Sequence, residues 1–322
     1  MAVPHGKVTE VLVDAFDLSG FLDEVTVSEE IANAATTAFK RNSVTRITGI
    51  DDGSLSYGGF FEKDDVNADD IENVMRAALG ASDGQIVTVG QQGSTVIGHR
   101  VKMLLARAGS WEINSVKDDA ATVSGELKAD GGVEGGVIVS PLGARTATVS
   151  TNTVVDNGLL GPAVSVTSSS VANPTVITAT AHGLNTGDVI VLSGHSGATP
   201  SLNGTAYTVT KVSDNTFTIP VNVTVGGTGG TFQRNASRIG AVGHLHCIAK
   251  AGTTPTLAVK IQHSLDNSTW VDLMTFATLN NATGKERIEY TGVIYRYVRC
   301  IYTITGTGPS FTFAVAFARR GA

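Results

Sequence analysis

The chain has few of the residues that build catalytic, metal or redox sites. Its 322 residues include only two cysteines, Cys247 and Cys300, and they form no CxxC pair. This excludes a disulfide framework and argues against a cysteine-based metal or redox motif. There is also no Ser-His-Asp elbow, P-loop or dinucleotide fingerprint, and the glycine run at residues 226–230 lacks the following helix that phosphate binding needs. We therefore expect no enzyme and no cofactor.

Charge, aromatic side chains and long apolar runs are scarce as well. Charged residues make up 16% of the chain and aromatic residues 6%, and no run of 18 apolar residues occurs. The segment from Met1 to Lys7 lacks the apolar core of a signal peptide. We therefore expect neither a membrane span nor secretion, and a protein kept in the cytoplasm while it assembles.

Glycine, valine and threonine are abundant instead. The chain has 37 glycines and 42% hydrophobic residues, with a mean hydropathy of +0.12. This composition favours short strands and tight turns over helices, and the length suggests about two domains. The sequence predicts a mainly β protein with folded cores.

The charge is divided unevenly between the two halves. Residues 1–140 hold 11 Lys and Arg against 22 Asp and Glu, a net of −11, whereas residues 141–322 hold 12 against 7, a net of +5. An acidic half is unsuited to reading nucleic acid by sequence, because such binding draws its affinity from Lys and Arg at the phosphates. It is compatible with a duplex that passes without adhering.

The first half alternates as strands do, with one helix among them. We expect strands at residues 8–13, 24–28, 85–89, 99–108, 110–116 and 120–129, and a long loop at residues 31–44. A helix begins after the possible cap Asn67 and stops at Gly80, with Ile71, Val74, Met75, Ala78 and Leu79 as its apolar stripe. Residues 131–142, rich in glycine and valine, close the first domain, and the polar stretch at residues 143–150 is expected to connect it to the second half.

The second half predicts two further β units. Residues 163–232 have low charge and repeated turn pairs, which is typical of a self-contained module. Strands are expected at residues 241–250, 256–263, 270–276, 285–289, 295–304 and 310–319, a regular spacing that predicts a β-sandwich.

Four groups of residues are candidates for chemical sites. His244 and His246 lie two apart, so a strand places both on one face, where they either share a zinc ion or simply face solvent while Leu245 and Cys247 turn inward. The acidic run at residues 64–70 either binds calcium or, more simply, supplies the N-terminus of the helix. The pairs Asp51-Asp52 and Asp118-Asp119 are interpreted as hairpin tips.

The aromatic residues of the second half form the fourth group. Trp270, Tyr290, Tyr295, Tyr297 and Tyr302 either provide a sugar-binding platform or belong to an ordinary surface ladder, with Ile294, Val298 and Ile301 buried beneath it. The ladder is the simpler interpretation. No metal-binding residue is assigned.

Several phrases resemble proteins of long-tailed bacteriophages. VLVDAFDLSGFL at residues 11–22, TTAF at 36–39, IDDGSLSYGGFF at 50–61 and ADGGV at 129–133 resemble major tail (tail tube) proteins. AHGLNTGDVI at 181–190, LNGTAYTV at 202–209 and NTFTI at 215–219 resemble a small β-barrel module. AVKIQHS at 258–264, YRYVR at 295–299 and PSFTFAVAF at 309–317 resemble a C-terminal jelly-roll decoration domain.

The resemblance implies a fold and a function. It implies a mainly β protein: a tail-tube β-sandwich with one flanking helix at residues 1–142, a jelly-roll-like β-sandwich at 143–162 and 233–322, and a small β-barrel inserted at 163–232. Such a subunit polymerises into stacked, hexameric rings that form a tail tube for DNA delivery, and it resides in the virion. Its partners are further copies of itself and other tail proteins, namely the tape measure, tail terminator and distal tail proteins, while viral DNA passes without sequence-specific binding.

The resemblance also implies where subunits meet. The N-terminal residues up to Lys7 are expected to form a contact arm, and residues 33–45 an intersubunit loop. The residues assigned to oligomerisation in that loop are Asn33, Thr36, Thr37, Phe39, Lys40 and Arg41. Two rival functions remain open: a host-surface protein that binds glycans at the tail tip or on the capsid, and a wall-degrading enzyme, which would need a convergent carboxylate pair.

Overall fold

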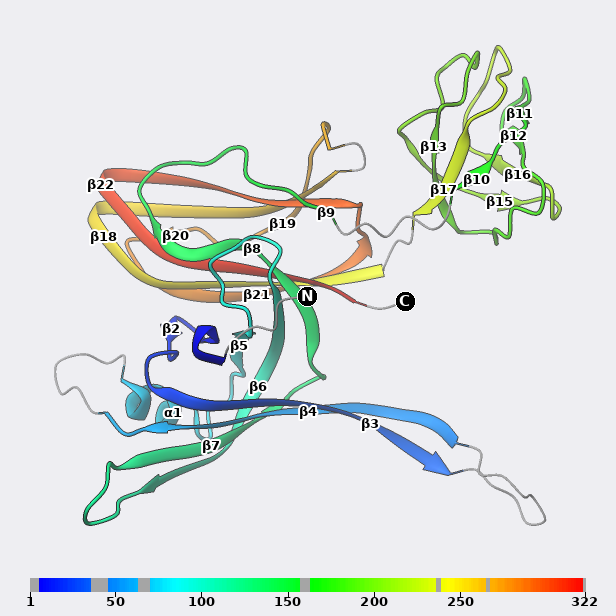
Figure 1. The fold of residues 1–322 in the computed structure, drawn as a ribbon. Helices are drawn as coiled ribbons and strands as arrows, with labels where there is room; N and C mark the ends of the chain where they lie inside the picture. Colours follow the sequence, from blue (N-terminus) through cyan, green and yellow to red (C-terminus); the bar gives the residue numbers. More distant parts are fainter. Residues whose placement is uncertain are drawn as a thin grey trace, which may run out of the picture.

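The protein is mainly β, as its composition predicts. The computed structural model describes residues 6–35, 46–62, 70–156, 163–235, 239–264 and 267–320 (Figure 1). Among these residues strands account for 60% and helix for 4%, and the strands form several sheets. Within these residues, no helix is both long and apolar enough to cross a membrane.

The N-terminal part consists of two β layers that share one strand. The first layer contains β1 (Glu10–Val13), β2 (Phe16–Asp17) and β5 (Gln85–Gly90), preceded by a 3-10 turn at Gly6–Val8. The second contains β3 (Leu22–Ala35), β4 (Arg46–Phe60) and β7 (Thr122–Ala129). The shared strand is β6 (Arg100–Asn114), whose first part pairs with β5 and whose last part pairs with β7.

Two sequence expectations about these strands are wrong. Residues 99–108 and 110–116 were expected as separate strands, but β6 runs through Gly109 with a register shift between Ala108 and Ser110. A bulge at this point lets the strand bend from one layer to the other without losing its partner. The loop expected from residue 31 is also wrong at its start, because β3 continues to Ala35.

One α-helix, α1 (Ile71–Ala78), flanks the two layers. Its apolar stripe is buried as expected, in a core shared with β1, β4, β5, β6 and β7, although Leu79 is exposed. The cap is not the expected Asn67, which lies outside the described residues, because the helix begins at Ile71. Asp70 accepts a hydrogen bond from the backbone N–H of Asn73 at 2.7 Å, which satisfies an amide of the first turn.

A strand crosses the expected boundary between the two halves and includes the first three residues of the expected connector, 143–145. β8 (Glu134–Arg145) pairs with β6 on one side and with the long C-terminal strand β22 (Tyr297–Arg319) on the other. The side chains of Ile138 and Val139 point to opposite faces of β8, and both are fully buried. Because this glycine-rich strand is buried on both faces, its sequence lacks the alternation of polar and apolar residues that would predict a strand.

The C-terminal part is built on two very long strands. β18 (Ile239–Ser264) pairs with β22 along nearly its whole length, with bulges between Cys247 and Thr256. The expected strand pairs 241–250 with 256–263 and 295–304 with 310–319 are therefore each one continuous strand. Shorter strands flank them, namely β9 (Val155–Asp156), β19 (Val271–Thr275), β20 (Leu279–Asn280) and β21 (Gly284–Val293). Aromatic side chains dominate their core, including Phe276, Phe311, Phe313 and Phe317.

The segment between β9 and β18 folds around a core of its own. One four-stranded sheet contains β10 (Val164–Ser165), β17 (Thr231–Asn235), β13 (Val189–Ser193) and β14 (Ala206–Thr208). The other contains β11 (Ser168–Ser169), β12 (Thr175–Thr178), β16 (Thr216–Ile219) and β15 (Thr210–Lys211). Phe217 and Phe232 meet edge to face in the core between them, and the described strands pair with none outside the segment.

Candidate functional site

The second layer of the N-terminal part has one apolar and one polar face. Its order is β3-β4-β7-β6. On the inner face Leu55, Tyr57, Val123 and Leu127 are buried in the core that includes α1. Because side chains alternate along a strand, their neighbours form the outer face, which consists of Thr26, Ser28, Glu30, Asp52, Ser54, Ser56, Ser124, Glu126, Lys128, Ser110 and Glu112.

This outer face is rich in small hydroxyl groups and carboxylates. Glu30 lies opposite Asp52, and Lys128 lies opposite Ser54, with its ammonium 3.8 Å from the Glu126 carboxylate. These residues line a shallow hollow of about 260 Å³. Arg107 shares the face by register, but its guanidinium is bound to Asp130 at 2.9 Å. The face therefore repels other anions.

The same layer has two unpaired edges among the described residues. β3 pairs with β4 alone, so one side of its 14-residue backbone has no strand partner. At the other end, the last part of β6, from Ser110 to Asn114, pairs only with β7. Open edges of this kind expose backbone donors and acceptors that favour pairing with another chain.

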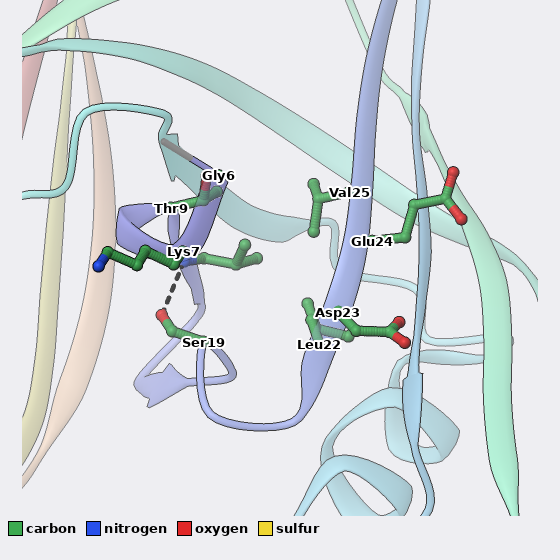
Figure 2. A pocket seen from close by; sticks show the side chains of 9 residues that line it. Gly6, Lys7, Thr9, Ser19, Leu22, Asp23, Glu24 and Val25 are labelled. Carbon is green, nitrogen blue, oxygen red and sulfur yellow. Dashed lines mark hydrogen bonds between the residues drawn. The ribbon is translucent and has the colours of Figure 1, made fainter. Parts of the chain in front are cut away.

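A groove of about 410 Å³ runs beside the free edge of β3 (Figure 2). Leu22 and Val25 line it from β3, and Thr9 and Ser19 line it from the segment around β1. Ser19 is held there because its hydroxyl oxygen accepts a hydrogen bond from Val11 N at 2.9 Å. The carboxylates of Asp23 and Glu24 point away from Thr9 and Ser19, so the groove leaves room beside the backbone of β3.

Strands β3 and β4 continue past β7 as a two-stranded arm (Figure 1). The last pair with β7 is Ser54 with Lys128, whereas β3 and β4 stay paired as far as Ala35 with Arg46. Two-stranded ribbons are marginal in water by themselves. The side chain of Ile31, on this arm, is exposed.

Of the residues assigned to oligomerisation, the structure describes Asn33 alone. The backbone of Asn33 pairs with Thr48 within the arm. Thr36, Thr37, Phe39, Lys40 and Arg41 lie outside the described residues. Their assignment remains a prediction. In the N-terminal segment, residues 1–5 also lie outside the described residues, and Lys7 belongs to the 3-10 turn beside the groove.

The histidine pair is buried rather than solvent-facing. His244 and His246 have no exposed surface, and neither has Cys247 on the opposite face. Three of the four ring nitrogens are hydrogen-bonded, two to the Thr88 hydroxyl and one to the carbonyl oxygen of Asp14. Among the described residues, no group of three His, Cys, Asp or Glu side chains is arranged to hold a metal ion.

The acidic candidates divide between helix, strand and turn. Of the run at residues 64–70, the structure describes Asp70, which caps α1. Asp51 and Asp52 lie within β4, so their assignment to a hairpin tip is wrong. Asp118 and Asp119 lie in the turn between β6 and β7, as expected.

The aromatic residues of the C-terminal part contact neighbours within the chain. Tyr302 is buried against Phe313, with ring centroids 5.0 Å apart. Tyr295 stacks on His263 at 4.2 Å, and the Arg299 guanidinium lies 4.1 Å from the Trp270 ring. Tyr302 is therefore a core residue, so its assignment to the exposed aromatic group is wrong. Ile294 and Val298 are buried as expected, while Ile301 is only partly buried.

Sequence reasoning predicted open edges and inward-facing carboxylates in the first half, but it did not locate the edges or the residues of the polar face. A local signal for the face exists, because Thr26, Ser28 and Glu30 alternate with Val25 and Val27. The strand predicted from the sequence ends at residue 28, so it is too short to show that its polar side chains form a continuous face. No local signal marks an unpaired edge, since it depends on which strands lie alongside.

No family model matches the sequence, and no curated protein matches it. Among solved structures, a chain of the virion of a native gene transfer agent particle is 14% identical, with a TM-score of 0.32, covering 41% of this chain and 97% of that chain. The SPP1 Dit protein, described as a paradigm of the hub adsorption apparatus of phages that infect Gram-positive bacteria, is 11% identical with a TM-score of 0.29, covering 97% and 98%. A chain of the anti-feeding prophage baseplate is 12% identical with a TM-score of 0.30, covering 42% and 97%.

Proposed function

We propose that this chain is a structural subunit of a phage tail that assembles with copies of itself into rings around a channel for DNA. The observation that carries the proposal is the layer β3-β4-β7-β6, which has a free edge at each end and a polar outer face. In this arrangement β3 of one copy lies beside the last part of β6 of the next. The number of copies, six by resemblance, is part of the proposal.

Edge pairing supplies the driving force for such a ring. Joining two free edges satisfies backbone groups that are otherwise left to water, and a closed ring leaves no edge for further growth. The groove beside Leu22 and Val25 provides space for the incoming strand. The arm that ends near Asn33 then extends over a neighbouring subunit, which supplies the packing that two strands lack alone.

The polar face suits the wall of a DNA channel. Glu30, Asp52, Glu112 and Glu126 repel phosphates, and the small serine side chains make few lasting contacts. Counterion release, the main source of affinity for DNA, needs free cationic side chains. Lys128 lies beside Glu126, and Arg107 is paired with Asp130, so the duplex slides without being held.

The remaining modules are assigned to the outside of the tube. We propose a ring-forming domain at residues 1–142, a decoration domain at 143–162 and 233–322, and an inserted module at 163–232. The separate core of the insert supports its division from the rest of the chain. Tape measure, terminator and distal tail proteins are the proposed neighbours in the virion.

Electron microscopy of the purified chain tests the proposal. We expect rings or tubes for the wild type and monomers for Val25→Lys, because a charge placed in the groove beside β3 opposes strand addition. The matched control is Val212→Lys, an exposed valine of the insert, which leaves assembly intact. Circular dichroism establishes that both variants are folded. Wild-type protein that stays monomeric at high concentration, or Val25→Lys that assembles like the control, contradicts edge pairing.

A further inference from the structure

Two buried histidines lie where the two halves of the chain meet. His244 and His246 are on β18, and the Thr88 hydroxyl that contacts both is on β5, more than 150 residues earlier in the sequence. The sheet brings them together because it runs from β5 through β6, β8 and β22 to β18 and then curls back. We refer to His244, His246, Thr88 and Asp14 as the seam.

The hydrogen bonds of the seam assign every proton. His246 Nδ1 lies 2.6 Å from the carbonyl oxygen of Asp14, which only accepts, so this nitrogen carries hydrogen. In the neutral ring Nε2 then accepts, and its donor is the Thr88 hydroxyl at 2.8 Å. Thr88 has no second hydrogen, so His244 Nδ1 donates to its oxygen at 3.1 Å. The chain is complete only while the imidazole of His246 is neutral, because its Nε2 must accept from Thr88.

Burial and the cations of β21 oppose an added proton, whereas the carbonyl oxygen and the carboxylate of Asp14 favour it at His246. On β21, Lys285 lies opposite His246 and Arg287 lies opposite His244. Lys285 is paired with Asp14 at 2.6 Å and Arg287 with Glu289, while β22 presents only Ala314 and Ala316 to the two histidines. His244 Nε2 is buried and has no hydrogen-bond partner, so a proton there would be a buried charge; the backbone of Val87 favours that proton, but burial outweighs it.

We propose that the seam is an acid-sensitive latch between the N-terminal and C-terminal halves, closed while His244 and His246 are neutral and opened when they bind protons. Protonated His246 turns its Nε2–H toward the Thr88 hydroxyl hydrogen, which must then rotate away and lose its acceptor. Protonated His244 places a charge in a fully buried site beside Arg287. Both events favour separation of β18 and β21 from β5 and the β1–β2 turn. This inference does not depend on the proposed function.

The direction and the range of pH follow from linkage. Burial lowers the pKa of His246 from 6.5 to about 4, and burial, followed by His246 and Arg287, holds the pKa of His244 well below its usual range. A pKa that is lower in the closed state means that the open state binds more protons, so the latch is stable above pH 6.5 and weakens as the pH falls toward 4. For His246 alone, the open-to-closed ratio rises roughly 20-fold between pH 7 and pH 5.

Hydrogen exchange of the full chain tests the latch. Exchange is followed from pH 7 to pH 4 and corrected for the pH dependence of the intrinsic rate. We expect amides of β1, β5 and the first half of β18 to lose protection together, while amides of β13 and β16 in the insert stay protected and serve as an internal control. The double variant His244→Gln, His246→Gln keeps polar side chains but cannot titrate, and its seam amides should not respond to pH.

Two results would overturn the latch. One is seam amides that stay protected while NMR shows both imidazoles protonated. The other is a double variant that loses protection over the same pH range as the wild type. If the double variant does not fold, Thr88→Ser, which keeps the hydroxyl, should exchange as the wild type does, and Thr88→Val should open the seam at pH 7. Equal protection in these two variants also overturns the proposal.

Discussion

In the inserted module, the hydroxyl of Ser169 lies 2.9 Å from Nε2 of His195, and both side chains are buried. His195 Nδ1 lies 2.7 Å from the carbonyl oxygen of Gly229, so it donates there, and Nε2 accepts from Ser169. Ser169 Oγ in turn accepts from Gly227 N at 2.8 Å. These hydrogen bonds tie the glycine-rich turn at residues 226–230 to β11. The run of glycines therefore has a structural role that needs no bound ligand.

Gly227→Ala is expected to destabilise the insert. A Cβ there would lie 2.6 Å from His195 Nε2 and 2.6 Å from the Ser196 carbonyl oxygen, so the turn must shift. We expect a loss of about 2 kcal/mol or more in the free energy of unfolding, as for overpacked cores. Urea unfolding followed by far-UV circular dichroism measures it. Gly204→Ala is the control, since its site is open and only its φ of +77° opposes a side chain; equal losses would show that packing is not the cause.

Asp70→Ala is expected to weaken α1. Asp70 is buried, its carboxylate accepts from Asn73 N, and its other oxygen accepts from the Asn73 side chain at 2.8 Å. Loss of an N-cap costs about 1 kcal/mol. Thermal unfolding measures the change. Glu72→Ala removes an exposed pair with Arg76 in the same helix and should change stability by less than about 0.5 kcal/mol. A similar effect of both variants would argue against capping.

Glu289 is expected to make the C-terminal part sensitive to strong acid. Hydrogen bonds from Arg320 lower the pKa of Glu289 to about 2, despite the opposing effect of burial, with further help from Arg287. Because the folded pKa lies below the usual 4.5, this stabilisation is present above pH 4.5 and is lost as the pH falls toward 2.

Urea unfolding at pH 4, 3.5 and 3 checks the role of Glu289. Glu289→Gln should flatten the decline in stability over this range. Glu286→Gln is the control on the same strand, where the carboxylate accepts from Ala277 N instead. A wild-type slope in the Glu289→Gln variant would exclude this group. The range lies below that of the histidine latch, so the two effects separate.

Reversing charge on the polar face is expected to create DNA binding. The double variant Glu30→Lys, Asp52→Lys replaces two carboxylates that lie opposite each other with ammonium groups. These cations can bind DNA phosphates and release their counterions. Fluorescence anisotropy with a duplex should show binding that weakens markedly between 50 and 200 mM salt, as is typical of phosphate contacts. Asp118→Lys, Asp119→Lys carries the same charge change in a turn away from this face. If assembled rings of the two double variants retained the same amount of DNA, the result would argue against the proposal that the polar face lines the channel.

Local patterns predicted part of the fold. The helix was predictable because a stripe such as Ile71, Val74 and Met75 needs only a few consecutive turns to show itself. The cap was not, since Asn67 and Asp70 are both suitable residues and the start of the helix depends on packing. Gly109 looked like a break between strands, but pairing with β7 carries β6 through it.

The site was less predictable than the fold. Alternation correctly placed His244 and His246 on one face of their strand. It did not show whether that face is buried, because this depends on which other strands cover it. The curl of the sheet brings Thr88 onto the second face. The unpaired edges of β3 and β6 similarly depend on which strands are absent from their sides.

Composition and short-range periodicity determined that this chain is mainly β, that one amphipathic helix accompanies the strands, and that its acidic groups gather in the first half. These properties depend on neighbouring residues, whose spacing the covalent chain sets. The tertiary structure alone decided which faces are covered, which edges stay open and which histidines are buried. Those outcomes depend on contacts between segments as distant as Thr88 and His244, and their pairing is chosen by the packing of the whole sheet.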